Sequence, residues 1–143
     1  MNDSTEPDTT KDTTKTPDRR AGIGSAGEQL AVEHLIRCGY EIVERNFRTR
    51  FGELDIIALT GSTIVFCEVK TRVARHGPAG SVAENPLESV HARKQGKVRA
   101  MAGRWLKERG DRPRSDELRF DAIGVTLDQS GALLALDHLE GAF

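Results

Sequence analysis

The chain has few of the residues that build zinc sites, disulfide frameworks or membrane spans. Only two of its 143 residues are cysteines, Cys38 and Cys67, and they form no C-x-x-C spacing. The four histidines are scattered without a metal-ligand spacing, so zinc is not expected and a reducing compartment is favoured. No apolar run approaches the ~20 residues of a membrane span, and the N-terminus lacks a signal-peptide core. We therefore expect a cytoplasmic protein with no membrane partner.

A global excess of positive charge is also absent. The formal net charge is −1, so any surface for nucleic acid must be local. Residues 1–20 consist largely of Thr, Asp, Lys and Pro, and cannot bury enough apolar surface to offset their ordering entropy. The remaining length fits one domain. The sequence predicts a disordered polar tail over residues 1–20 and a single folded domain over residues 21–143.

The first helix is predicted from its end signals. Residues 22–27 match G-x-G-x-x-G, but a polar tail precedes them where a dinucleotide site needs a buried strand. Ser25 is instead the expected N-cap of a helix that runs to about Cys38 and stops at Gly39. Glu28 either completes a capping box with Ser25 or takes part in a site. These alternatives stay open on the pattern alone.

A second helix is predicted over residues 85–109, with Asn85 as N-cap and Pro86 at the first helical position. The irregular residues 72–85 before it are typical of a functional lid or a mobile loop. Asp121 is either a further polar member of the site or a strand-end residue, and the second interpretation is favoured. The expected core face of the second helix is Leu87, Val90, Met101, Trp105 and Leu106, and extended segments are expected at residues 40–44, 45–51, 55–59, 64–71, 118–127 and 132–139.

Two of these strands form a predicted hairpin around the turn at residues 60–63. Its register pairs Asp55 with Glu68 and Glu53 with Lys70, and places these side chains on one face. Two carboxylates at this spacing repel each other by up to roughly 4 kcal/mol at 4 Å and an effective dielectric near 20. A divalent cation reverses that repulsion, and oxygen ligands suit Mg²⁺ or Mn²⁺. Lys70 on the same side is placed to orient or help deprotonate an attacking water, or to neutralise charge in the transition state.

A purely structural interpretation of the hairpin has equal support from spacing alone. Lys70 would pair with Glu53 as a surface ion pair worth ~0.2–1 kcal/mol, and Glu68 would bond to Arg50 or Arg72. A slip of one residue in the turn would separate the two carboxylates altogether.

A family resemblance bears on this choice. Asp55 followed by Glu68-Val69-Lys70 resembles the PD-(D/E)XK nuclease signature, with Leu54 where the signature has proline. Over residues 22–143 the chain more closely resembles the YraN family of uncharacterised, endonuclease-like bacterial proteins. The matching segments are residues 27–28, 31, 35, 39–40, 45–48, 52–57, 65–72, 94–95, 119–121, 138 and 142–143.

The resemblance implies an α/β, restriction-endonuclease-like fold similar to Holliday junction resolvases: a mixed central β-sheet flanked by helices, in the order α-β-β-β-α-β. It implies that Asp55, Glu68 and the backbone carbonyl of Val69 bind Mg²⁺ or Mn²⁺. Lys70 would assist the attacking water, and Glu28 would complete the catalytic site.

The expected partner is DNA or RNA, hydrolysed at its phosphodiester bonds by a metal-dependent nuclease. One alternative is a non-catalytic nucleic-acid-binding module that keeps the nuclease fold, and another is a scaffold that contacts a protein through residues 72–85. The oligomeric state, a homodimer included, stays open. The expected nucleic-acid contacts are Arg48, Arg50, Arg72, Lys94, Gln95 and Lys97.

Overall fold

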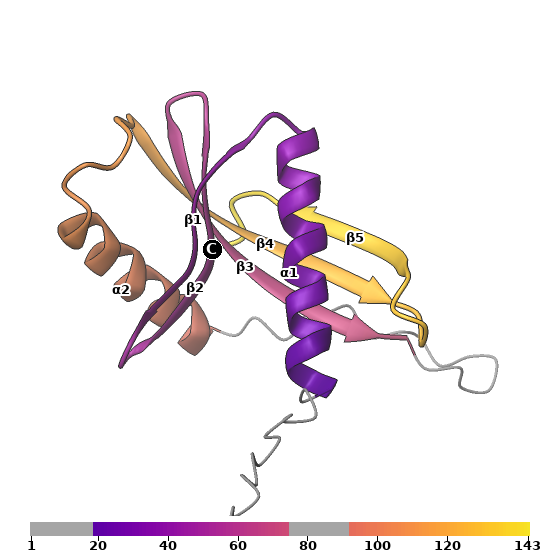
Figure 1. Cartoon of the computed structure of the whole chain (residues 1–143). Coiled ribbons are helices and arrows are strands. Elements are labelled where there is room, and N and C mark those ends of the chain that lie inside the picture. The colour runs from indigo at the N-terminus through magenta and orange to yellow at the C-terminus, as the bar shows by residue number, and fades with distance from the viewer. Residues whose placement is uncertain (1–18, 75–91) are drawn as a thin grey trace, which may run out of the picture.

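A five-stranded mixed sheet carries one helix on each face in the computed structural model, which describes residues 19–74 and 92–143 (Figure 1). The strand order is β1-β2-β3-β4-β5, and β3 with β4 is the parallel pair. The expected α/β class is confirmed, and β5 adds a strand to the order that the resemblance implied. The elements are α1 (Arg19–Arg37), β1 (Glu41–Thr49), β2 (Gly52–Thr60), β3 (Thr63–Val73), α2 (Ala92–Glu108), β4 (Glu117–Leu127) and β5 (Leu133–Leu139).

The start of α1 differs from the prediction. The helix begins at Arg19, so Ser25 lies inside it and the expected capping box between Ser25 and Glu28 is wrong. The glycine motif at residues 22–27 also lies inside this helix. The residues after Ser25 pack on the sheet, and tertiary packing supplies most helix stability, so the helix does not need Ser25 as its start signal. The rest of the expected polar tail, residues 1–18, lies outside the described residues.

The end of α1 confirms the prediction of a stop at Gly39. The helix ends at Arg37, and Gly39 adopts a left-handed conformation with φ of 90°. Gly39 N donates to Ile36 O at 3.0 Å, and Tyr40 N donates to Leu35 O at 2.9 Å. These bonds satisfy carbonyls that the helix end would otherwise leave unpaired.

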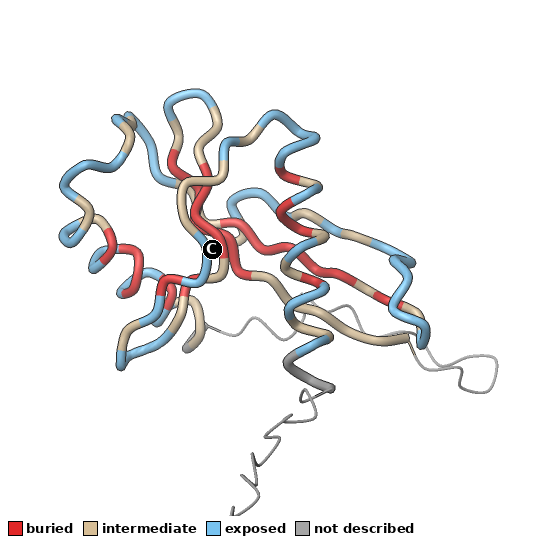
Figure 2. The backbone as a smooth tube through the Cα atoms, viewed as in Figure 1, coloured by how far each residue is buried: buried red, intermediate tan, exposed pale blue. Residues whose placement is uncertain are grey.

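Two hydrophobic clusters cover the two faces of the sheet, and Figure 2 shows the buried residues running along the central strands and the inner sides of both helices. Cys38, at the expected end of the first helix, is exposed one residue beyond α1. The buried cluster under α1 comprises Ala31, Val32, Leu35, Ile56, Ala58, Val65, Cys67, Ile123, Val125 and Leu127. The buried cluster under α2 comprises Phe47, Leu54, Ile57, Ile64, Phe66, Val98, Met101, Ala102 and Trp105.

The remaining elements match their predictions with small shifts. Residues 40–44 and 45–51 form one strand, β1, with a register shift between Ile42 and Glu44. Met101 and Trp105 are buried in α2 as expected, whereas the predicted start of this helix at residues 85–90 lies outside the described residues. Within the described residues, neither helix combines the length and hydropathy needed to cross a membrane.

Candidate metal site

The β2–β3 hairpin has the predicted register, but its backbone pairing ends just before the two carboxylates. Ile57 pairs with Phe66, and the last paired position toward the open end is Ile56 with Cys67. At the next position, Asp55 Oδ2 accepts a hydrogen bond from Val69 N at 2.8 Å. The Asp55 side chain thus takes the place of a ladder hydrogen bond, and its carboxylate is fixed in the opening between the two strands.

Asp55 and Glu68 turn toward different helices, contrary to the expectation that they share a face. Leu54 and Ile57 pack under α2, while Ile56 packs under α1, so the alternation of β2 breaks at Asp55. The conformation of β1, the other neighbour of β2, explains this break in the alternation. Asn46 lies between the paired positions Arg45/Ile56 and Phe47/Leu54, and its backbone has a left-handed φ of 53°.

A group of three carboxylates forms where β2 passes α1. The carboxylate oxygens of Glu28, Glu53 and Asp55 lie within 4.8 Å of one another. They are the one such group of potential metal ligands among residues 19–74 and 92–143. Hard cations such as Mg²⁺ and Mn²⁺ take their ligands from oxygens of this kind. Glu28 and Asp55 therefore meet as expected, and Glu53 joins them.

The Asn46 side chain joins two of these carboxylates. With its amide oriented so that the nitrogen faces them, Nδ2 donates to Glu28 Oε2 at 3.0 Å and to Glu53 Oε1 at 3.1 Å. The left-handed backbone at Asn46 and its two-donor amide together hold the pair beside Asp55. Sequence reasoning missed both Glu53 and Asn46 as site residues, although an Asn between strand residues is a known signal for a left-handed conformation.

Close packing sets the position of Glu28. Its neighbour Gly27 is buried against β3, where an added Cβ would lie 1.8 Å from Thr71 Oγ1. Only glycine permits this approach of helix to strand. The approach brings the Glu28 carboxylate over the opening that Asp55 occupies.

Glu68 lies next to this group with a partner of its own. It is only 6% exposed, and its Oε1 lies 2.5 Å from Lys94 Nζ on α2. The structural interpretation expected Arg50 or Arg72 as the partner of Glu68, and the structure shows an ion pair with Lys94. Glu53 pairs with Arg48 at 3.2 Å and not with Lys70.

The electrostatics of the site disfavour its ionised state without a cation. Burial and the neighbouring charge of Glu68 raise the pKa of Asp55 to about 8, against the opposing hydrogen bond from Val69 N. The charges of Glu28 and Glu53 also contribute to this raised pKa. Burial and the charge of Glu53 also raise the pKa of Glu28. A bound divalent cation would offset each of these repulsions.

The other predicted residues differ in their exposure and contacts. Lys70 and Arg72 lie partly buried on the last part of β3. The guanidinium of Arg50 lies 4.7 Å from the centre of the Phe51 ring. On α2, Gln95 is partly buried and Lys97 is exposed. Val69 meets Asp55 through its backbone N–H, and its carbonyl stays a predicted metal ligand.

Comparison with known proteins places the chain in a family. Residues 27–125 match the model of "Uncharacterised protein family UPF0102". A UPF0102 protein of Frankia casuarinae is 41% identical over 123 residues, covering 85% of this chain and 95% of its own length. One from Geobacter metallireducens is 43% identical over 122 residues, covering 85% of this chain and 91% of its own. The chain therefore belongs to UPF0102, the family named YraN in the sequence comparison above.

Proposed function

We propose that the chain is a Mg²⁺- or Mn²⁺-dependent nuclease that hydrolyses phosphodiester bonds in DNA or RNA. The observation that carries this proposal is the convergence of Glu28, Glu53 and Asp55 within 4.8 Å at the open end of a hairpin. Glu68 lies close enough to Asp55 to raise its pKa. Without a cation, the mutual repulsion of these carboxylates lowers the stability of the fold. A bound divalent cation would offset that repulsion.

The proposed roles combine these positions with the roles that the family resemblance implies. Asp55, Glu68 and the carbonyl of Val69 bind the metal, and Glu28 completes the site. Glu53, which the structure adds, is a further ligand or a base for the attacking water. Lys70 stabilises the charge that develops at the scissile phosphate. The mixed sheet between two helices is consistent with a nuclease-like fold and supports this assignment by analogy.

Substrate binding is assigned to five basic residues and Gln95. Arg48, Arg50, Arg72, Lys94, Gln95 and Lys97 are the proposed contacts to phosphate and sugar, which confer affinity without sequence preference. Lys94 has a specific part in this scheme because it neutralises Glu68 in the described structure. When substrate binds, Lys94 would leave Glu68 and pair with a substrate phosphate, and Glu68 would bind the metal.

The first experiment is isothermal titration of Mn²⁺ into wild type, Asp55→Asn and Glu68→Gln. Binding to wild type and its loss in both variants is the expected result. Glu33→Gln is the matched control, since Glu33 is an exposed residue of the same helix as Glu28 and lies outside the acidic group. Wild type that binds no Mn²⁺, with or without an added oligonucleotide, would contradict the metal site.

The second experiment measures cleavage of branched, linear and single-stranded DNA and RNA with Mg²⁺ or Mn²⁺. Wild type should cut at least one class, and Asp55→Asn prepared in parallel should not. Equal cleavage by both preparations would identify a contaminant and overturn the proposal.

The Lys94–Glu68 ion pair favours one competing function, a nucleic-acid-binding module without catalysis, because it leaves one predicted ligand neutralised. That module would bind nucleic acid in a salt-sensitive manner. Its binding would survive Asp55→Asn and would be accompanied by no cleavage with either metal.

A further inference from the structure

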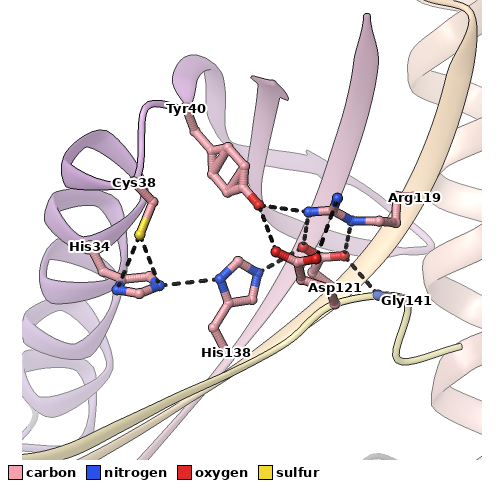
Figure 3. A network of polar contacts seen from close by, with 8 residues as sticks. His34, Cys38, Tyr40, Arg119, Asp121, His138 and Gly141 are labelled. Carbon is pink, nitrogen blue, oxygen red and sulfur yellow. Dashed lines mark hydrogen bonds and ion pairs between the residues drawn. The ribbon is translucent and has the colours of Figure 1, made fainter. Parts of the chain in front are cut away.

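Two histidines from opposite ends of the folded chain meet on the α1 face of the sheet. His34 lies in the last turn of α1 and His138 lies in β5, 104 residues later, and Figure 3 shows their rings pointing toward each other. His34 Nε2 is 3.2 Å from His138 Nδ1. Two nitrogens that bind one tetrahedral zinc ion at about 2.0–2.1 Å lie about 3.3 Å apart. The imidazole pair therefore already has the spacing of two zinc ligands.

A buried carboxylate fixes the tautomer of His138. Asp121 is 0% exposed, and its Oδ2 lies 2.7 Å from His138 Nε2. Because a carboxylate accepts, the proton of the ring is held at Nε2 and the lone pair of Nδ1 points to His34. Metal-binding histidines are commonly oriented by a carboxylate in this way.

The carboxylate is itself held rigidly. Arg119 donates to both oxygens of Asp121 at 2.8 Å, and Gly141 N donates to Oδ1 at 3.1 Å (Figure 3). The Arg119 guanidinium also donates to the Tyr40 hydroxyl at 2.7 Å. Three separate donors therefore keep Asp121 ionised and immobile, and His138 has little freedom to turn away from His34.

A thiol lies within reach of the same point. Cys38 is exposed one residue beyond α1, four residues after His34, and its Sγ is 3.8 Å from His34 Nε2. Residues four apart on a helix share a face. The acidic group described above is the one set of three ligand atoms within 4.8 Å of one another in the described parts of the chain. Cys38 must therefore rotate toward His138 to complete a site.

We propose that His34 Nε2, His138 Nδ1 and Cys38 Sγ bind a zinc ion, with Asp121 as the positioning residue behind His138. Two neutral imidazoles and one thiolate are common zinc ligands, and a water completes the tetrahedron. Binding releases the thiol proton to solvent as the Zn–S bond forms. The ion links the end of α1 to β5. The cysteine and histidine spacing in the sequence gave no indication of zinc, because the fold and not the spacing brings these residues together.

Cobalt(II) is the probe for this site. Titrated into the full chain carrying Asp55→Asn, which weakens the acidic site, Co²⁺ should give tetrahedral d–d bands and a thiolate-to-cobalt charge-transfer band. Zn²⁺ should abolish both bands by displacement. Cys38→Ser should lose the charge-transfer band, and His138→Gln should weaken binding by more than the 10–100-fold that outer-shell changes cost. Glu33→Gln, next to His34 in sequence, should leave the spectrum unchanged.

Far-ultraviolet circular dichroism checks that each variant is folded. Cys38 is exposed and His138 is only partly buried, so both variants are expected to fold. Zn²⁺ should also raise the Tm of the parent protein and not that of Cys38→Ser. A parent protein without a charge-transfer band in excess Co²⁺ would overturn the proposal, as would a band that persists in Cys38→Ser. A pair of histidines that are simply hydrogen-bonded to each other would give the first of these results.

Discussion

At the residue scale, Asp55 should make the metal-free protein less stable as the pH rises. Its folded-state pKa of about 8 lies above the value near 3.9 of an unfolded chain, because of burial and the charge of Glu68. The folded state therefore binds the Asp55 proton more tightly, and this stabilising contribution is full below about pH 4 and lost as the pH rises through 8.

Asp55→Asn removes this titration and still offers an oxygen to Val69 N. In EDTA, we expect the free energy of unfolding of the variant, relative to that of wild type, to be higher at pH 9 than at pH 5. The expected difference between the two pH values is at least about 1.4 kcal/mol, the equivalent of one pKa unit. Urea unfolding at the two pH values measures the difference. An equal gain in the free energy of unfolding at both pH values would show that the pKa of Asp55 is not perturbed.

Asn46 separates backbone strain from side-chain function at a single position. Asn46→Gly accepts the φ of 53° but loses the donor to Glu28 and Glu53, whereas Asn46→Ala loses the donor and adds strain. We expect Mn²⁺ affinity to fall in both variants. Stability should fall by about 1–2 kcal/mol more in Asn46→Ala than in Asn46→Gly. Calorimetric titration and urea unfolding measure the two quantities, and unchanged affinity in Asn46→Gly would exclude a positioning role.

At the element scale, the contact between α1 and β3 depends on Gly27. Gly27→Ala should destabilise the fold by about 1–3 kcal/mol, because the new Cβ would lie 1.8 Å from Thr71 Oγ1. Gly24→Ala is the matched control. With nothing within 4 Å of its added Cβ, it should stabilise the helix by up to about 1 kcal/mol. Thr71→Ala should recover part of the loss in Gly27→Ala, and additive effects in this double-mutant cycle would show that the two residues do not clash.

The elements also show what the sequence could predict. The hairpin register followed from strand alternation and the turn at residues 60–63, and the end of α1 followed from Gly39. The start of α1 did not, because the helix continues through Gly22 and Gly24, residues of low helix propensity. The sequence could not predict the reversal of faces at Asp55 either, because this reversal depends on the conformation of Asn46 in the neighbouring strand. That reversal also places the Glu53 carboxylate in the site.

At the scale of the whole molecule, Asp121 connects segments that are distant in sequence. Expected as a strand-end residue, it is instead fully buried and joins β4 to β5 and to the backbone of Gly141. Its bonds to Arg119 extend the connection to Tyr40 beyond α1. No local pattern predicts such a residue, because each partner arrives through the tertiary fold.

This network should govern unfolding in acid. Burial alone would raise the pKa of Asp121, but the hydrogen bonds from His138, Arg119 and Gly141 outweigh it and hold the pKa at about 2. Since the folded-state pKa lies below the unfolded one, the contribution is full above about pH 4. It is lost as the pH falls through 2, and amounts to about 2.6 kcal/mol at about 1.4 kcal/mol per pKa unit.

Asp121→Asn should therefore flatten the fall in stability between pH 4 and pH 2 in metal-free protein. At pH 7 it should destabilise by no more than the about 3–5 kcal/mol of a broken buried pair, since Arg119 keeps 27% of its side chain exposed. Asp137→Asn, an exposed change on β5, should alter neither quantity. Urea unfolding across this pH range makes the test. If Asp121→Asn keeps the wild-type slope in acid, then other carboxylates control acid unfolding, and the network joins β4, β5 and α1 by packing and not by charge.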